Sequence, residues 1–207
     1  MLYSYLVTVD NGSAPCVTND LLSLAICKPA IRRCAKVNDI IVGFCAKSMK
    51  LNYNYPQILY IAKITKVISL DEYFSIHKER KDCIYDNNLN MLNNNFHSLS
   101  NKKTDLRGKH VSLSTDFLFF GTKHITLDSL FYLIVPKYQG HFSKKNSVHE
   151  QEFKQYFKEL KLKYVTSKVG KHIHITNKIC RVEKCVQLTN KSCITKNKNN
   201  SKNSKVY

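Results

Sequence analysis

Two neighbouring strand candidates constrain the fold more than any other feature of this sequence. Residues 58–68 form the longest run rich in apolar and β-branched residues, and residues 40–44 form a shorter run of the same kind. Residues 47–56, which lie between them, are broken by asparagines and lysines and are typical of a hairpin loop. Parallel neighbours need a crossover of a dozen or more residues, usually a helix. The spacing therefore disfavours a doubly wound parallel fold.

Most of the remaining secondary structure is also predicted as strand, and the helices are short. Residues 150–164 have apolar residues at the spacing of an amphipathic helix, and Asp71 and Asp128 are typical N-caps of two short helices. The other strand candidates are residues 2–9, 22–26, 111–113 and 117–121. We predict an α+β domain with a curved, mostly antiparallel sheet, followed by a C-terminal helix and a basic tail.

Composition divides the chain into three parts. Residues 1–143 are predicted to form the domain, interrupted by an Asn-rich, poorly periodic surface insert at about 78–104. Residues 144–164 form the amphipathic helix, and residues 165–207 form a basic, partly disordered extension that ends in a Lys/Asn/Ser tail. Deletion of residues 165–207 is expected to leave a folded domain.

The charge of the chain favours polyanionic partners. The sequence has 33 basic and 15 acidic residues, a formal net charge of +18. Residues 144–207 alone hold 16 Lys and Arg against 4 Asp and Glu. Such an excess favours nucleic acid first and an anionic membrane surface second. The basic extension is therefore expected to contribute sequence-independent attraction to phosphates, unless it only aids solubility.

Nothing in the sequence indicates a membrane segment or a secretory leader. No apolar run reaches the length of a spanning helix, and the first residues have neither a basic leader nor a long apolar stretch. We expect an intracellular protein with no membrane partner, in the cytoplasm or nucleus of the producing or infected cell, or in a virion. The eight cysteines are then expected to be reduced thiols. The abundance of residues with AT-rich codons points to an AT-rich virus or microbe.

A basic helical turn is the clearest candidate for ligand binding. Pro29 suits the first position of a short helix, and Lys28, Arg32 and Arg33 fall within six residues around it. Guanidinium groups bind phosphate or carboxylate bidentately. Because Arg32 is four residues from Lys28, the two are expected to face one phosphate together. Lys47 and Arg107 complete the predicted phosphate-binding set. The alternative is a solvated basic face with no ligand.

A catalytic set is also conceivable from the sequence. Cys27 could act as a thiolate nucleophile towards an electrophilic carbon of a pyrimidine or an ester, if Lys28 or His141 lowered its pKa. Asp10 would complete this set. The structural alternatives are that Cys27 is a small residue packed at a strand end, and that Asp10 hydrogen-bonds its own turn next to Gly12.

Several common chemistries lack their sequence signature. The chain has no P-loop, no Rossmann glycine fingerprint and no serine nucleophile elbow. The C-terminal cysteines and the His172-x-His174 pair are too irregularly spaced for a standard zinc site. We therefore expect no metal and no cofactor. Among the aromatic residues, some could stack on a base, although most are expected in the core: Tyr3, Tyr5, Phe44, Tyr60, Phe119 and Phe120.

Short blocks spread in order over residues 2–142 carry a family resemblance. They comprise Asp10, Gly12, Ala14 and Pro15; Leu24, Ala25 and Cys27 to Pro29; Ile31 to Arg33; Asp39 and Ile41 to Gly43; Asp71 to Phe74; Asp105 to Gly108; Phe119 to Gly121; and Gly140 with His141. Together they resemble the nucleotide modification associated domain 2 family, found mostly in phages, bacteria and large viruses. Asn38 departs from the glycine expected in that corner.

The resemblance implies an association with systems that make or handle modified DNA bases. A second similarity, to EVE and other PUA-like domains, rests on the order of a basic helix, a Gly-Asp-like corner, a core strand and a long strand. It implies that the sheet could instead be a PUA-like pseudo-barrel that buries a modified or flipped base.

Taken together, these patterns predict a nucleic-acid or nucleotide-binding protein linked to modified bases. A base would enter a pocket while the basic helical turn holds phosphate. Two alternatives stay open. One is an enzyme of DNA base modification or modified-nucleotide processing that uses Cys27, Asp10 and His141. The other is a basic viral protein that packages nucleic acid through net charge.

Overall fold

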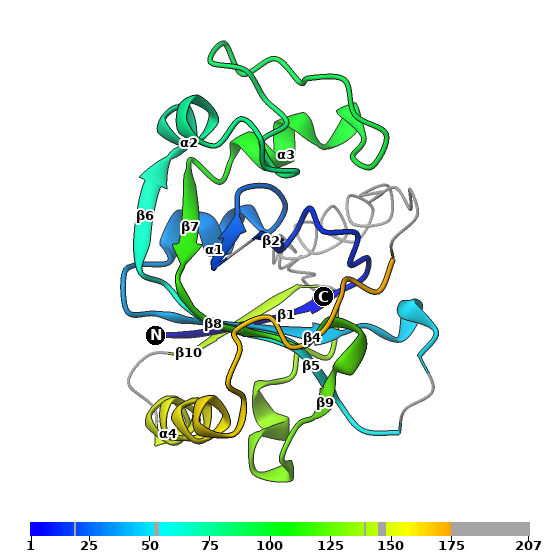
Figure 1. Ribbon diagram of the computed structural model, residues 1–207, viewed down its shortest axis with the longest axis vertical. Coiled ribbons are helices and arrows are strands. Elements are labelled where there is room, and N and C mark those ends of the chain that lie inside the picture. The colour runs from blue at the N-terminus through cyan, green and yellow to red at the C-terminus, as the bar shows by residue number, and fades with distance from the viewer. Residues whose placement is uncertain (19, 52–53, 139, 145–147, 175–207) are drawn as a thin grey trace, which may run out of the picture.

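The computed structural model describes residues 1–174, apart from residues 19, 52–53, 139 and 145–147. The predicted Lys/Asn/Ser tail and the three C-terminal cysteines lie outside the described residues. Two β-sheets form the body of the molecule, with short helices around them (Figure 1). The predicted α+β class is confirmed.

The first sheet, sheet A, has mixed strand directions. Its strands are, in order, β10 (His141–Lys144), β1 (Leu2–Val7), β4 (Ile40–Cys45), β5 (Gln57–Lys63) and β8 (Asp116–Phe119), with β9 (Ile125–Thr126) also paired to β5. β1 and β4 run parallel, whereas the other neighbours are antiparallel. Leu2 pairs with Ile40, and Tyr5 pairs with Gly43 on one side and His141 on the other.

The second sheet, sheet B, is antiparallel throughout. Its order is β2 (Cys16–Thr18), β3 (Leu21–Leu24), β7 (His110–Ser114) and β6 (Lys66–Ser69). Neither sheet closes on itself within the described residues, so the expected pseudo-barrel is not confirmed.

The long strand predicted over residues 58–68 is in fact two strands in different sheets. β5 belongs to sheet A and β6 to sheet B, and the chain changes sheet at Ile64 and Thr65. Ile64 donates its backbone N–H to Asp39 O at 2.8 Å, and Thr65 donates to Leu113 O at 2.9 Å. These partners come from elsewhere in the chain. The local sequence stays β-prone across the break, so the hydrophobic pattern alone did not reveal it.

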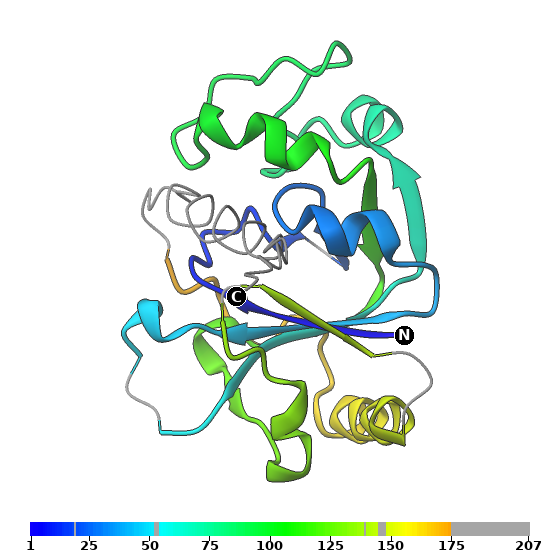
Figure 2. The same ribbon diagram turned by 180° about the vertical axis from the view of Figure 1, so that it is seen from behind.

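Helices cover both faces of sheet A. Below it in Figure 1 lies α4 (Val148–Lys163), and above it lie sheet B, α1 (Pro29–Cys34), α2 (Leu70–Ile76) and α3 (Lys102–Leu106); Figure 2 shows the same layers from behind. The 3-10 helices are η1 (Lys47–Met49), η2 (Leu99–Asn101), η3 (Gly121–Lys123) and η4 (Ser129–Ile134). No helix in the described ranges has both the length and the apolar character needed to cross a bilayer.

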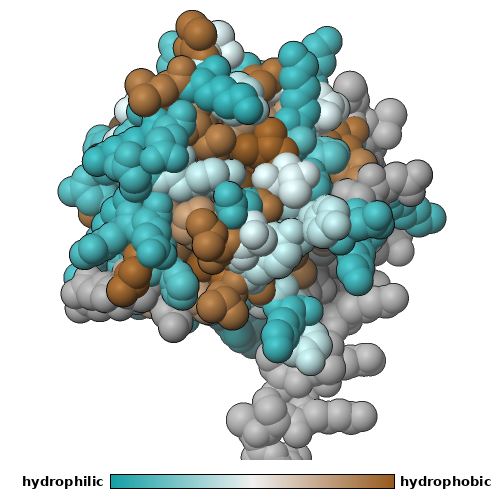
Figure 3. All heavy atoms as spheres, turned by 90° about the horizontal axis from the view of Figure 1, so that it is seen from below, coloured by the Kyte–Doolittle hydropathy of each residue, from teal (hydrophilic) through white to brown (hydrophobic). Residues whose placement is uncertain are grey.

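Apolar side chains that alternate between the two faces of sheet A form one core on each side of it. In β4, Ile41 packs in the upper core, whereas Ile40, Val42 and Phe44 pack in the lower one. The predicted amphipathic helix is confirmed as α4, and its Phe153 packs edge-to-face on Phe131 of η4, with ring centroids 5.1 Å apart. The lower face, formed by α4 and η4, mixes hydrophobic and hydrophilic side chains at its surface (Figure 3).

The two predicted helix caps have different outcomes. Asp128 caps η4, because its Oδ1 accepts a hydrogen bond from Leu130 N at 3.0 Å. The cap of α2 is Ser69 instead of Asp71, since Ser69 Oγ accepts from Glu72 N at 3.1 Å. The prediction for Asp71 was wrong by two residues.

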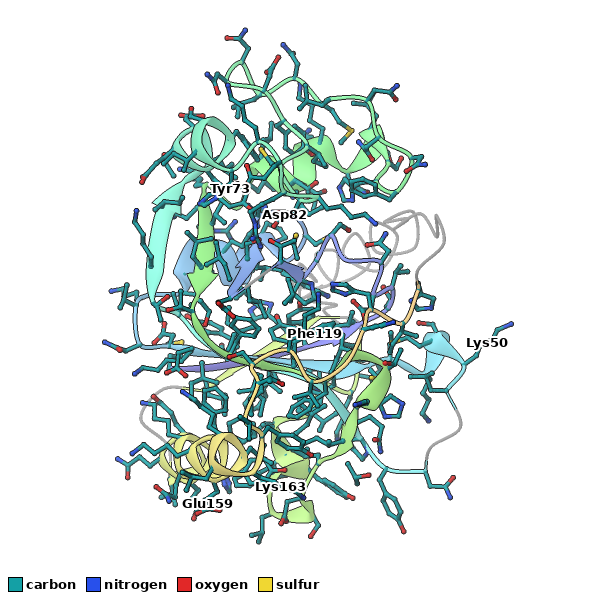
Figure 4. The ribbon with its side chains drawn as sticks, in the orientation of Figure 1. Lys50, Tyr73, Asp82, Phe119, Glu159 and Lys163 are labelled. Atoms are coloured by element: carbon teal, nitrogen blue, oxygen red, sulfur yellow. The ribbon has the colours of Figure 1, made fainter. Side chains whose placement is uncertain are left out.

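The segment predicted as a surface insert at about 78–104 is partly buried. Asp82, Arg80, Tyr85 and His97 are all buried, and they pack over sheet B with α2. Figure 4 shows Tyr73 and Asp82 together in this upper layer, where Tyr73 OH and Ser23 Oγ donate to the Asp82 carboxylate. Burial raises the pKa of Asp82. The polar composition of this segment concealed its role as a cover of the second sheet.

The chain after α4 also belongs to the folded body. Val169 donates its backbone N–H to Phe119 O at 2.8 Å, and Thr122 N donates to Lys171 O at 2.8 Å. Ile173 N donates to Asp10 Oδ2 at 2.9 Å. The extension predicted from residue 165 therefore includes a packed segment, residues 167–174, which we call the return segment.

Because the return segment is packed, truncation before it should destabilise the protein more than truncation after it. Removal of residues 165–207 leaves the buried Asp10 carboxylate without the Ile173 and His172 donors, and should lower the free energy of unfolding by about 3 kcal/mol. Removal of residues 175–207 retains these donors and should change stability by less than about 1 kcal/mol. Urea denaturation of the two truncated chains checks this; equal stabilities would show that the return segment is dispensable.

Candidate functional site

A strained corner precedes α1. Cys27 and Lys28 have φ values of 59° and 41°, in the left-handed region that residues with a side chain rarely adopt. The corner follows β3 and ends where Pro29 begins the helix, as the sequence predicted. A buried acceptor and a buried donor hold its peptide groups: Cys27 N donates to Asp105 Oδ1 at 2.8 Å, and Arg32 Nε donates to Cys27 O at 2.8 Å.

Asp105 is the buried acceptor of this clamp. Its Oδ2 accepts a hydrogen bond from Tyr85 OH at 2.9 Å and lies 2.6 Å from His97 Nε2. The residue is 2% exposed. Its carboxylate thus joins the corner to the layer that covers sheet B. This explains the physical role of the Asp105-Leu106-Arg107-Gly108 block.

Arg32 is the buried donor of the clamp. Besides Cys27 O, its guanidinium donates to His110 O at 3.1 Å and to Asp105 O. Burial lowers the pKa of Arg32, and the charge of Asp105 opposes that shift. A Cβ on Gly108 would lie 2.2 Å from Arg32 Cζ, so only glycine leaves room for the guanidinium there.

The burial of Arg32 corrects its predicted role. The side chain is 0% exposed, so it cannot meet a phosphate on the surface together with Lys28. The exposed arginine of this helix is Arg33, whose Nη1 donates to Arg107 O at 3.2 Å. This bond places Arg33 and Arg107 next to each other on neighbouring helices. The sequence could not show which of Arg32 and Arg33 is buried, because both faces of so short a helix are basic.

Lys28 lies against a buried tyrosine pair. Its Nζ is 4.7 Å from the ring centroid of Tyr5, within the range of a cation–π contact. Tyr60 OH donates to Tyr5 OH at 2.9 Å, and the two rings meet edge-to-face. Burial raises the pKa of both phenols, and the Tyr60, Cys27 and Asp10 groups raise that of Tyr5 further. Both tyrosines are therefore neutral hydrogen-bonding groups.

His141 joins Lys28 and Arg33 on one surface. It is exposed, and it pairs with Tyr5 across β1 and β10. Partial burial, then the charges of Lys28 and Arg33, lower the pKa of His141. Two cations therefore lie close enough to disfavour a third charge. We call the surface of Lys28, Arg33, Arg107 and His141 the basic face. Lys47 is exposed on η1, beyond the end of β4, and the described contacts do not connect it to this face.

Asp10 is an anchor for the return segment. It is fully buried; its Oδ1 lies 2.5 Å from His172 Nδ1, and its backbone N–H donates to His174 Nδ1 at 3.0 Å. Its carboxylate is thus occupied by His172 and Ile173, which differs from the predicted role as a partner of Cys27. Tyr5 connects the three predicted residues: the charges of Cys27 and Asp10 raise its pKa, and His141 is its neighbour across β1 and β10.

The aromatic residues considered for base stacking, and two of the cysteines, are buried in the protein. The six aromatic residues considered for base stacking are all buried in the cores, and Figure 4 shows Phe119 at the centre of the molecule. Burial raises the pKa of the Cys16 and Cys45 thiols to about 12. Among the described residues, no group of three His, Cys, Asp or Glu side chains could hold a metal ion.

These features define a class: an α+β protein of two open sheets whose clamped corner adjoins a basic face. A model of the family described as nucleotide modification associated domain 2 matches residues 1–177. The chain belongs to this family, and the resemblance noted from the sequence is confirmed. The matched range includes the return segment. Comparisons with curated proteins and with solved structures found no match. The family name connects the chain with nucleotide modification.

Proposed function

We propose that this protein binds nucleic acid or a nucleotide with a modified base, holding phosphate at the basic face. The observation that carries the proposal is the clamped corner at Cys27 and Lys28. Left-handed backbone at residues with side chains costs about 1–3 kcal/mol each and persists only where the surroundings enforce it. Here Asp105 and Arg32 enforce it at two successive residues. Such strain is typical of a functional site.

The charges around the corner support phosphate as the ligand group. Lys28 and Arg33 both lower the pKa of His141, so like charges are gathered on the basic face. An anion would relieve this repulsion, and arginine forms strong charge-assisted hydrogen bonds to phosphate. The family membership supports a nucleotide as the source of that phosphate.

The base itself would lie beside the corner, near Cys27 and the Tyr5 side of β1. The analogy with PUA-like domains, which bury a base in a pocket, supports this part of the proposal. The analogy concerns how a base is held, and it does not require that the sheet close into a barrel.

A binding assay with paired variants tests the proposal. Lys28→Gln and Arg33→Gln should each weaken binding of a short fluorescent single-stranded DNA about tenfold, because a hydrogen bond to a charged group contributes about 1.5 kcal/mol. Each should also reduce the salt slope by about 0.7. Fluorescence anisotropy at two salt concentrations measures both quantities. His141→Ala should change the preference between modified and unmodified bases more than it changes the slope.

The matched controls are Lys158→Gln and Lys163→Gln. Both lysines are exposed on α4, below sheet A, and Figure 4 shows Lys163 there, on the opposite side of sheet A from α1. Each control removes the same charge and should leave affinity nearly unchanged. An equal loss in all four variants would contradict the proposed site and would favour binding through net charge, the packaging alternative.

The strain at Cys27 also favours a second candidate, an enzyme of base modification with Cys27 as nucleophile. His141 would then be the remaining predicted acid or base, since the Asp10 carboxylate is occupied by His172 and Ile173. Cys27→Ser separates the two functions. A binding protein should keep its affinity within a few-fold, whereas a thiolate catalyst should lose turnover by orders of magnitude.

A further inference from the structure

A basic pocket lies apart from the basic face. It is bounded by the turn after Asp10, by β2, by Lys81 and by the return segment, and its volume is about 330 Å³. Its polar wall comprises Asn11, Thr18, Lys81, Lys168, Lys171, His172 and His174. None of the four residues of the basic face lines it. We call this cavity the lysine pocket.

The lysine pocket has a wall of one charge sign. Three lysines line it, and no Asp or Glu does. Two carboxylates are adjacent in sequence to lining residues: Asp10 precedes Asn11, and Asp82 follows Lys81. Both are fully buried and accept hydrogen bonds inside the protein. Among the described residues, the ion pairs do not include Lys81, Lys168 or Lys171. Three lysine charges therefore meet at the pocket without an ion-pair partner among the described residues, which favours an anionic ligand.

The backbone that carries these lysines is fixed. Lys171 O accepts a hydrogen bond from Thr122 N, and Lys171 N donates to Thr122 Oγ1 at 3.2 Å. Next to Lys168, Val169 donates to Phe119 O. Lys81 Nζ donates to Asn11 O at 2.5 Å and lies 4.8 Å from the centroid of the Phe96 ring. The lysines are thus carried on a backbone that is already fixed, which reduces the backbone entropy lost on binding.

The remaining wall is apolar and shaped by a glycine. Val17 and Cys16 contribute apolar surface, and Gly12 has a φ of +83°. A Cβ on Gly12 would lie 3.2 Å from His172 Cδ2, so glycine permits the close approach of the turn to this ring. The volume is at the small end of the range for small-molecule sites, about 300–1,000 Å³. Such a cavity suits one nucleotide better than a strand.

We propose that the lysine pocket binds the phosphomonoester of a single nucleotide, a nucleoside 5′-monophosphate. A phosphomonoester carries close to two negative charges at neutral pH, whereas an internal phosphodiester carries one, so three lysines favour the monoester. The apolar wall receives the nucleoside part. This site is separate from the basic face and does not depend on the function proposed for it.

Isothermal titration of the full chain with four probes tests the lysine pocket. Deoxycytidine 5′-monophosphate should bind saturably, and inorganic phosphate should compete with it. Deoxycytidine and the dinucleoside monophosphate dCpdC, which has only a diester, should each bind at least about tenfold more weakly. Equal binding of deoxycytidine would overturn the proposal, because phosphate would not be recognised. Equal binding of dCpdC would overturn it in favour of a strand phosphate.

Variants assign the binding to this pocket. The double variant Lys168→Gln/Lys171→Gln should weaken deoxycytidine 5′-monophosphate binding by at least about tenfold, and Lys158→Gln/Lys163→Gln on α4 should not. Loss of deoxycytidine 5′-monophosphate binding in Lys28→Gln, without a loss in Lys168→Gln/Lys171→Gln, would place the binding at the basic face and overturn the assignment to the lysine pocket. An equal loss in both double variants, or no loss in either, would overturn the assignment.

Discussion

Replacing Arg32 by alanine is expected to lower the free energy of unfolding by about 3–5 kcal/mol. The substitution leaves the carbonyls of Cys27, Asp105 and His110 without their buried donor and opens a cavity beside Gly108. Urea denaturation followed by circular dichroism measures the loss.

The neighbouring arginine is the matched control. Arg33 is exposed, and Arg33→Ala should change stability by no more than about 0.5 kcal/mol. It should affect ligand binding instead. If Arg32→Ala were as stable as Arg33→Ala, Arg32 would not support the fold, and its predicted role as a phosphate ligand would return.

Replacing Asp105 by alanine is expected to have a similarly large effect, about 3–5 kcal/mol. Three groups lose their partner at once: Cys27 N, Tyr85 OH and His97 Nε2. Asp105→Asn should be less damaging, since the amide keeps one oxygen acceptor. The same denaturation assay measures both variants.

An exposed carboxylate controls for the loss of charge. Asp71 lies in the first turn of α2, where a negative side chain contributes less than about 1 kcal/mol. Asp71→Ala should therefore be mild. If Asp105→Ala were equally mild, the corner at Cys27 and Lys28 would hold its conformation without the clamp, and the argument from strain would fail.

Local patterns predicted much of the fold. Residues 40–44 became β4 and the helix at residues 150–164 became α4, because alternation and helical periodicity follow directly from which face is buried. The break between β5 and β6 was missed because it depends on bonds from Ile64 to Asp39 and from Thr65 to Leu113. Such long-range partners leave no mark on the local hydrophobic pattern.

The candidate site was predicted in part. Lys28, Arg33 and His141 do gather on one surface, although His141 is far away in the chain. Arg32 was misassigned because helical spacing tells which residues share a face, but not which face is buried. The anchoring of Asp10 by the return segment was also missed, since a His-rich stretch in a basic extension looks like solvated chain.

The central claim is that an anion binds at the basic face, and the titration of His141 tests it most directly. Partial burial and the charges of Lys28 and Arg33 lower the pKa of this imidazole. A bound phosphate offsets those charges and favours the protonated form, so the pKa of His141 should rise. By the same linkage, affinity for DNA should increase as the pH falls through that pKa.

The measurement is the pH dependence of the His141 ring-proton NMR shifts in the full chain, with and without saturating single-stranded DNA. His124 is the internal control, because burial alone lowers its pKa and it lies at the C-cap of η3, where its Nδ1 is 3.0 Å from Gln57 Oε1. We expect the pKa of His141 to rise on DNA binding while that of His124 stays constant. An unchanged pKa of His141 in the DNA-bound protein would contradict the account.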